Sequence, residues 1–470
     1  MAKYERLSAL DRSFLDVENQ ASHMHVAGVM ILDSAPLTTP SGGIDIDRIR
    51  AGVAASLPMM TRYRQRIERV PVGGQPVWVD DDRFNLDYHV RHTALPRPGD
   101  EDQLKRLAGR IFSQQLDRGK PLWETWVIEG LDGGRFAMIS KTHHCMIDGI
   151  SAVDLVSTLL SPSPDVVELP PAAPWNPDPA PTPGELLVDE ATRRIRSPFQ
   201  LGETMLEAFQ NPLDAFDSFT EQLGAIGETI GAGFSPASDT PFNHPIGPHR
   251  RFDWMVMDLA EVKSIKNRLG GTVNDVVLAT VAGAVGAFLA RRGFPPERIS
   301  SLDFRALVPV SVRTAAQRGT LGNRIAAWPA PLPIAEPDPR RRLEAVHAIT
   351  ADLKQSRQAM GAEVLARVSE WTVSTLLTVA MRMTARARAY NITVTNVPGP
   401  QMPLYMLGSR LLAAYPMGPL FENQALNIAL LSYDGKLHWG LNADFDALPD
   451  LREMIAALQA SFAALQKAAS

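Results

Sequence analysis

The sequence predicts a mixed α/β protein made of two linked halves. Its 470 residues are about three times a common domain length, so more than one folding unit is expected. Nine prolines occur between Pro162 and Pro183, a density that excludes helices and central strands. Strand-like and helix-like patterns occur on both sides of this stretch. We therefore expect a first half of residues 1–161, a proline-rich and amphipathic bridge of residues 162–249, and a second half of residues 250–470.

In the first half, short runs of β-branched and aromatic residues predict strands, and apolar residues three and four apart predict helices. The expected strands are His25–Leu32, Gln75–Val79, Leu86–Val90 and Phe136–Lys141. The expected helices are Leu104–Leu116 and Ile150–Leu160.

In the bridge, residues 185–230 alternate apolar and charged residues at helical spacing. In the second half, Thr272 and Asp275 are placed to cap a helix over Asn274–Arg292. Two further helices are expected over Ala362–Arg382 and Leu451–Gln466. The expected strands of this half are Ala306–Val312, Asn391–Val397, Leu426–Ser432 and Leu437–Asn442.

Composition excludes several functional classes. The net charge of −5 provides no general attraction to nucleic acid, and no nucleic-acid partner is expected. A single cysteine excludes a disulfide framework and a cysteine-rich zinc site, and it suits a reducing cytoplasm. The longest uncharged apolar stretch, Val276–Ala290, is shorter than the ~18–20 residues of a membrane span, so we expect a core helix there. We find no signal peptide, and any membrane contact is expected to be peripheral.

One motif is typical of acid–base chemistry. The strand ending at Lys141 runs into His143-His144-Cys145-Met146-Ile147-Asp148-Gly149, and a helix is expected to follow. A neutral imidazole has an ordinary pKa of ~6.5, which suits a general base near neutral pH. Asp148 could cap the helix or pair with an arginine such as Arg313, and Gly149 permits a tight turn.

Three other interpretations of the motif remain open. The histidine pair could be structural. A metal site would need further ligands, and none lies nearby at zinc-like spacing, so no metal is expected. Cys145 as a nucleophile would need its own base, and on a strand it would point away from its neighbour His144. The sequence lacks a G-x-S-x-G elbow, a glycine-rich phosphate loop and a dinucleotide fingerprint, which disfavours serine hydrolases and nucleotide-driven enzymes.

The motif resembles the HHxxxDG signature of the CoA-dependent acyltransferase superfamily, which includes chloramphenicol acetyltransferase and nonribosomal condensation domains. Further segments resemble the bacterial wax ester synthase/acyl-CoA:diacylglycerol acyltransferases in particular. They follow one another in the order typical of that family and extend over most of the chain. They are Leu7–Leu15 with Met24–Gly28, Pro121-Leu122-Trp123-Glu124, Thr272–Ala279 and Asn391–Pro400.

The resemblance implies two chloramphenicol-acetyltransferase-like subdomains with an active-site tunnel at their interface. It implies His144 as the general base, with His143, Asp148 and Gly149 shaping the loop around it. Hydrogen bonds to a developing oxyanion could come from the first turn of the helix near position 274 or from a strand of the second half. These oxyanion candidates are Asn274, Asp275, Thr395 and Asn396, and the candidates that shape the tunnel are Pro121, Leu122 and Trp123.

The expected activity is transfer of a long-chain acyl group from acyl-CoA to the hydroxyl of diacylglycerol or of a long-chain alcohol. Acyl-CoA would be a co-substrate, and no bound cofactor is implied. The resemblance also implies a cytoplasmic protein at the inner membrane face or on lipid droplets, and it leaves the oligomeric state open, with a homodimer as one option. Two alternatives are a condensation-type enzyme that takes its acyl group from a carrier protein and a catalytically silent lipid-binding homologue.

Overall fold

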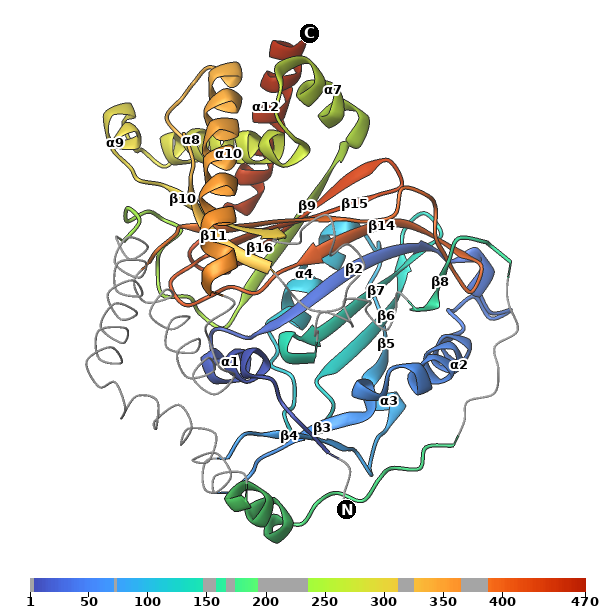
Figure 1. The fold of residues 1–470 in the computed structure, drawn as a ribbon. Helices are drawn as coiled ribbons and strands as arrows, with labels where there is room; N and C mark the ends of the chain where they lie inside the picture. Colours follow the sequence, from blue (N-terminus) through green and yellow to red (C-terminus); the bar gives the residue numbers. More distant parts are fainter. Residues whose placement is uncertain are drawn as a thin grey trace, which may run out of the picture.

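The computed structural model describes residues 4–71, 74–146, 158–165, 174–192, 236–311, 325–364 and 388–470. Within these ranges the chain forms two large mixed sheets, a small three-stranded sheet and helices packed on them (Figure 1). This arrangement confirms the predicted mixed α/β class. The small sheet has the order β1-β4-β3, formed by Glu5–Arg6, Val77–Asp80 and Gln65–Glu68.

The first large sheet has seven strands in the order β5-β6-β7-β2-β14-β13-β8. At its centre β2 runs antiparallel to β7, from His25 opposite His143 to Asp33 opposite Arg135. Only β5 and β6 are parallel neighbours. The strands are β5 (Val90–Ala94), β6 (Trp123–Leu131), β7 (Arg135–His143), β2 (His25–Asp33), β14 (Ser409–Met417), β13 (Tyr405–Met406) and β8 (Leu160–Ser161). The helices of this half are α1 (Ala9–Val17), α2 (Ile46–Ser56), α3 (Leu86–His89) and α4 (Glu101–Phe112).

The second large sheet has six strands in the order β11-β10-β12-β15-β16-β9. Figure 1 shows its helices gathered on the upper side of this sheet. The strands are β11 (Ile325–Pro331), β10 (Arg305–Ser311), β12 (Ile392–Pro398), β15 (Leu426–Tyr433), β16 (Lys436–Asp444) and β9 (Arg250–Asp258). The helices are α7 (Leu259–Leu269), α8 (Val273–Arg291), α9 (Pro296–Ser300), α10 (Pro339–Val364) and α12 (Leu451–Ala469).

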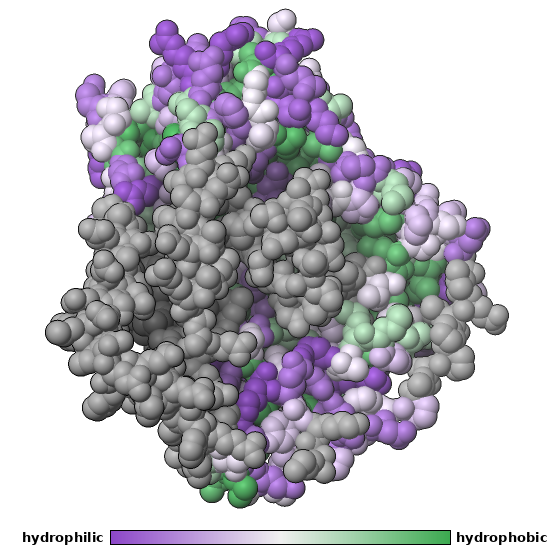
Figure 2. Space-filling view, viewed as in Figure 1, coloured by the Kyte–Doolittle hydropathy of each residue, from purple (hydrophilic) through white to green (hydrophobic). Residues whose placement is uncertain are grey.

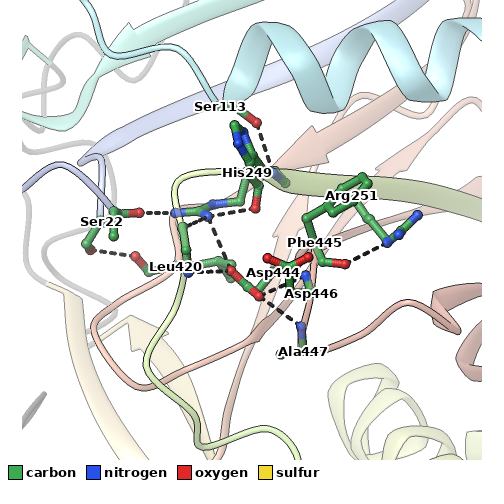
Figure 3. A network of polar contacts seen from close by, with 12 residues as sticks. Ser22, Ser113, His249, Arg251, Leu420, Asp444, Phe445, Asp446 and Ala447 are labelled. Carbon is green, nitrogen blue, oxygen red and sulfur yellow. Dashed lines mark hydrogen bonds and ion pairs between the residues drawn. The ribbon is translucent and has the colours of Figure 1, made fainter.

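The two halves of the chain are interlocked. Strands β13 and β14 lie between β12 and β15 in the sequence, but they belong to the first sheet, where β14 pairs with β2. Apolar residues from both halves share one core cluster, in which Ile139 of β7 packs with Trp254 of β9 and Tyr415 of β14. A hydrogen bond from Ser22 Oγ to Leu420 O, 2.7 Å long, also joins the halves (Figure 3).

Helix α8 confirms both the predicted helix and its predicted cap. Thr272 Oγ1 accepts a hydrogen bond from the Asp275 backbone, and the Asp275 side chain accepts one from the Thr272 backbone. By length and composition α8 is the one helix of the described ranges that could cross a membrane, yet 72% of its most apolar window is buried inside the protein. It packs in the main core cluster of the second half.

The proline-rich part of the bridge before residue 183 is extended where it is described. Residues 174–182 form no helix or strand, as their proline content predicts, and residues 183–192 are helical. Trp175 Nε1 donates a hydrogen bond to Asp81 O at 2.9 Å, and the guanidinium carbon of Arg64 lies 3.9 Å from the centre of its ring. This extended segment is therefore anchored to the first half through Trp175.

Most predicted elements coincide with observed ones, but one assignment was wrong. Leu86–Val90 was expected to be a strand, and instead Leu86–His89 is the short helix α3, with β5 beginning at Val90. Asn85 explains the difference, because its side chain accepts the backbone N–H of Asp87 at 2.9 Å and starts a helical turn. Almost all of the predicted helices Ile150–Leu160 and Ala362–Arg382, and residues 193–235 of the bridge, lie outside the described residues.

Candidate active site

The histidine pair lies where β7 ends, and the backbone there is held from both sides. His143 is the last residue of β7, and His144 begins the short 3-10 helix η4 (His144–Met146). The N–H of His143 donates to Leu122 O at 2.9 Å, and the N–H of His144 donates to Met24 O at 2.8 Å. The chain segments that precede β6 and β2 therefore fix the positions of both histidines.

His143 is the inner histidine, and its side chain is 1% exposed. Its Nδ1 accepts the backbone N–H of Cys145 at 3.1 Å, so the proton of a neutral ring lies on Nε2. This Nε2 lies 3.6 Å from Glu18 Oε2. His143 thus stabilises the turn into η4 and faces a buried carboxylate.

Glu18 connects the two histidines to α1 and to the segment before β6. Arg118 donates to Glu18 Oε2 from Nη2 at 2.6 Å and from Nε at 3.1 Å. Glu18 Oε1 accepts the N–H of Met24 at 3.2 Å, and the carbonyl of the same Met24 accepts the N–H of His144. Burial alone would raise the pKa of Glu18, but His143 and Arg118 outweigh it and hold this pKa well below its usual range. Glu18 is therefore a carboxylate.

His144 is the outer histidine, and it is only partly buried. Its ring stacks on Phe14 of α1 with centroids 4.1 Å apart and an interplanar angle of 26°. Its Nδ1 is buried without a hydrogen-bond partner in the described part of the chain. Buried polar groups are nearly always paired, and a catalytic role is one explanation of an unpaired one. This imidazole is held in place by packing on Phe14, and among the described residues its Nδ1 has no hydrogen-bond partner.

The environment of His144 lowers its basicity below the expected value. Burial, assisted by the neighbouring His143, lowers the pKa of His144 to about 4 instead of the ordinary ~6.5. The ring is therefore neutral at physiological pH, as a proton acceptor must be.

Cys145 is buried, and burial raises the pKa of its thiol well above the ordinary value. A thiol that stays protonated is a poor nucleophile, which argues against covalent catalysis by this residue.

A polar pocket of about 550 Å³ opens beside Arg118. Arg91 and Glu124 line it and form an ion pair of 3.2 Å. Glu124 also contacts Lys141 Nζ at 2.5 Å, and Lys141 is fully buried in β7, two residues before His143. Arg91, Glu124 and Lys141 therefore form a connected network of charged groups on the inner side of the site.

Asn274 and Asp275 lie in the first turn of α8. The Asp275 carboxylate accepts Thr350 Oγ1 at 2.7 Å and lies 2.9 Å from His347 Nδ1, in addition to its contact with Thr272. Burial would raise the pKa of Asp275, but these hydrogen bonds lower it. Its hydrogen-bonding capacity is used within the fold, so Asp275 stabilises the contact between α8 and α10. Asn274 is partly exposed at the same helix end.

The other predicted site residues occupy different places. Thr395 and Asn396 are partly exposed on β12 and pair with Ala429 and Leu430 of β15. Among the described residues, neither they nor Asn274 form a hydrogen bond or a ring contact with His144. Asp148, Gly149 and Arg313 lie outside the described residues.

The three residues Pro121, Leu122 and Trp123 are buried beside the histidines. Trp123 Nε1 donates to Tyr63 O at 2.8 Å, and its ring stacks on His89 with centroids 4.5 Å apart. Together with the bond from His143 N–H to Leu122 O, these contacts make the segment a rigid support for the end of β7.

Sequence reasoning missed Phe14, Glu18 and Arg118. Phe14 lies in a segment that carried the family resemblance, and Glu18 and Arg118 lie beside two such segments. Glu18 and Arg118 are 100 residues apart in the chain, so only the fold brings them together. The fold also brings His25 close to the histidine pair. It faces His143 across β2 and β7, with Nε2 2.8 Å from Phe112 O.

Residues 7–277 match the model of the wax ester synthase/diacylglycerol acyltransferase catalytic domain, and residues 321–466 match the C-terminal domain of the same family. The chain belongs to the wax ester synthase/diacylglycerol acyltransferase family. It is therefore an acyltransferase, and the match to the catalytic domain includes the histidine pair. The resemblance predicted from the motifs is confirmed.

Curated relatives agree with this assignment. The chain is 35% identical to a Mycobacterium tuberculosis protein assigned as a diacylglycerol O-acyltransferase, over 96% of this chain and 88% of that protein. It is 31% identical to a second such protein of that species, over 98% of this chain and 95% of the relative.

Solved structures show the same fold. The wax ester synthase/diacylglycerol acyltransferase of Marinobacter aquaeolei aligns with a TM-score of 0.72 at 24% identity, over 99% of both chains. The first condensation domain of the calcium-dependent antibiotic synthetase aligns with a TM-score of 0.55 at 14% identity, over 99% of this chain and 96% of that domain. The predicted acyltransferase-like architecture is thus confirmed.

Proposed function

We propose that this protein transfers a long-chain acyl group from acyl-CoA to the hydroxyl of diacylglycerol or of a long-chain alcohol, with His144 as the general base. The names of the relatives support the diacylglycerol acceptor, and the name of the family supports both acceptors. Acyl-CoA is the co-substrate, and no other bound cofactor is part of the proposal.

The observation that carries the proposal is the state of His144. It is a neutral, partly exposed imidazole that stacks on Phe14, and the backbone N–H of the same residue donates to the Met24 carbonyl. In the proposed reaction His144 accepts the proton of the acceptor hydroxyl while the oxygen attacks the thioester carbonyl. The carbon–sulfur bond then breaks, CoA leaves as a thiolate, and His144 returns the proton to the sulfur. The transfer is direct, without an acyl-enzyme, and a placed base of this kind contributes ~10²–10⁴-fold.

His143, Glu18 and Arg118 position the base in this scheme. The backbone N–H of His144 donates to the Met24 carbonyl, and the N–H of Met24 donates to the Glu18 carboxylate. A misplacement of the base by about 1 Å can cost ~10²-fold in rate, so a rigid support matters.

Further hydrogen bonds would stabilise the oxyanion that forms during attack. Asn274, Thr395 and Asn396 remain our candidates for these donors, and Asp148 with Gly149 for shaping the loop after His144. Pro121, Leu122 and Trp123 would hold the wall behind the base. Since both substrates are lipids, we place the enzyme peripherally at the inner membrane face or on lipid droplets.

The test supplies purified protein with radiolabelled palmitoyl-CoA and either dioleoylglycerol or hexadecanol. Formation of labelled triacylglycerol or wax ester supports the proposal, and failure with both acceptors rejects the substrate class. A parallel reaction with palmitoyl-acyl carrier protein as the only donor tests the condensation-type alternative, which the likeness to condensation domains supports at the level of the fold alone. Turnover with that donor and none with palmitoyl-CoA would reject the CoA-dependent assignment.

A further inference from the structure

An exposed apolar loop follows β12 at the edge of the molecule. The chain from Asn391 to Ser409 contains no Asp, Glu, Lys or Arg. Within it Val397 is 46% and Met402 is 52% exposed, and Leu412 of the adjacent β14 is 43% exposed. Figure 2 shows hydrophobic surface on the right-hand side, where Figure 1 places the ends of β8 and β14. Soluble surfaces ordinarily mix charges among such residues, so this loop, residues 397–404, is unusual.

Several polar groups of the apolar loop are paired within the protein. Three of its eight residues are prolines, which have no backbone N–H. The Gln401 side chain donates to Gly399 O and to Ser432 Oγ and accepts the N–H of Gly435, at 2.9, 3.1 and 3.2 Å. The prolines are Pro398, Pro400 and Pro403.

The loop backbone is also anchored to the end of β15 and to the turn after it. The N–H of Gly399 donates to Ser432 Oγ at 3.1 Å, and that of Leu404 donates to Tyr433 Oη at 2.8 Å. Pro400 O accepts the N–H of Asp434 at 3.1 Å. Each such pairing lowers the cost of contact with an apolar phase, because an unpaired polar group costs several kcal/mol in lipid. The loop is therefore anchored through Gly399, Pro400 and Leu404, while the side chains of Val397 and Met402 are exposed.

The loop is also continuous with the apolar interior beside the histidine pair. Leu404 and Leu407 pack against a core cluster that contains Met406 and Leu411 of the β13–β14 hairpin. The same cluster contains Cys145 and Met146, the residues directly after His144. An apolar molecule that meets the protein at the loop thus meets the end of a core that reaches the candidate active site.

We propose that residues 397–404, together with Leu412, dock on a phospholipid membrane surface, from which the lipid acceptor is taken up. The inference rests on the proposed function for the identity of the acceptor, whereas the docking surface itself rests on the exposure, the absence of charge and the internal hydrogen bonding of the loop. Docking buries Met402 and Leu412, and burial of one large apolar side chain strengthens binding by about tenfold or more.

The test measures partition of the full-length protein onto vesicles of phosphatidylcholine and phosphatidylglycerol by flotation. We expect the double variant Met402→Asp/Leu412→Asp to lower the partition coefficient at least about tenfold, and Met402→Leu to keep it. The matched control is Val188→Asp, since Val188 is 66% exposed on the helix of residues 183–192, at the bottom of Figure 1. It is expected to bind like the wild type. Thermal unfolding of each variant establishes that it is folded.

Activity separates this inference from the proposed function. With acceptor embedded in vesicles the double variant is expected to lose rate, while with a water-soluble acceptor such as hexanol it keeps the wild-type rate. Ester formation absent from the wild type with every acceptor would reject the proposed function and leave the flotation result standing. Equal flotation of the double variant and the wild type would overturn the docking surface. A second result would also overturn it: a wild-type protein that is dimeric and does not float, together with a double variant that is monomeric. The loop would then bind a second copy of the chain.

Discussion

The carboxylate of Glu18 lies 3.6 Å from the imidazole of His143, and both side chains are 1% exposed. Arg118 contacts the same carboxylate oxygen, Oε2. A buried negative charge is therefore fixed directly behind the histidine pair, with the segment after α1 joined to the end of β7. The Met24 N–H also donates to Glu18, and the Met24 carbonyl accepts the N–H of His144. The Glu18 carboxylate therefore holds the residue before β2 that positions His144.

Replacing Glu18 by Gln is predicted to lower the free energy of unfolding by about 2 kcal/mol, because hydrogen bonds to a charged group are lost in a buried place. We expect kcat to fall and KM to change little, since the proposed base is displaced while the substrate contacts stay. Urea unfolding and steady-state kinetics measure the two effects. Asp16→Asn, which removes the exposed partner of Arg12 on the same helix, is the control and should change stability by less than about 0.5 kcal/mol. Strictly additive effects of Glu18→Gln and Arg118→Met would contradict the coupling.

The pH dependence of catalysis is predicted to reflect the lowered pKa of His144. A base whose pKa is about 4 stays neutral as the pH falls through 6.5, so kcat/KM should hold its plateau down to about pH 5. Initial rates between pH 4.5 and 8, taken with protein shown to be folded at each pH, measure the profile. An acid limb centred at pH 6.5 or above in the free enzyme would contradict the environment described for His144.

Stability is predicted to fall in acid because His89 and His438 are buried. Burial lowers the pKa of each to about 4, against ~6.5 in the unfolded chain. Between these values the unfolded state binds more protons, so stability is complete above pH 6.5 and declines until about pH 4, by roughly 3 kcal/mol for each residue. His438 lies between the rings of Tyr415 and Tyr433. His438→Phe should flatten this decline in urea unfolding measured across pH, and an unchanged slope would count against it.

Arg250 is predicted to stabilise the contact between the two halves. Its guanidinium donates to Gly247 O at 2.6 Å and to Ala21 O of the first half, and it lies 3.8 Å from Asp444. Burial lowers its pKa to about 10. Arg250→Met should cost about 3 kcal/mol of stability, since it leaves the buried Asp444 without this cation.

The neighbouring Arg251 serves as the control for that substitution. Its guanidinium carbon lies 3.8 Å from the ring centre of Phe445, and its Nε donates to Phe445 O at the surface (Figure 3). Arg251→Met should lower the midpoint of thermal unfolding far less than Arg250→Met. Equal decreases of this midpoint in the two variants would contradict a special contribution of Arg250 to the contact between the halves.

Local patterns in the sequence were sufficient for β7 and α8, but α1 and β6, which carry Phe14 and Trp123, were not among the expected elements. The strand into the histidine pair and the capped helix α8 follow from residue types within a few positions of one another, which local propensity and capping determine. The strand assigned to Leu86–Val90 failed for a local reason too, because the Asn85 side chain starts a helical turn that apolar content alone does not reveal.

The rest depends on contacts between distant parts of the chain. Nothing near Ser409–Met417 indicates that this strand leaves its neighbours to pair with β2, nearly 400 residues earlier in the chain. The pairing of Glu18 with Arg118 and the lowered pKa of His144 likewise follow from burial, which only the assembled fold determines. His144 could therefore be proposed as the base from the motif, while its supporting contacts and its lowered pKa could not be predicted.

The most direct test of the account is the rate of ester formation by His144→Ala with palmitoyl-CoA and the acceptor that the wild type uses. His92→Ala, which removes a partly exposed histidine of β5, is the matched control, and circular dichroism checks the fold of both variants. We predict a loss of ~10²–10⁴-fold in kcat/KM for His144→Ala and a rate near that of the wild type for His92→Ala. A folded His144→Ala variant that forms ester at the wild-type rate would contradict the assignment of His144 as the base.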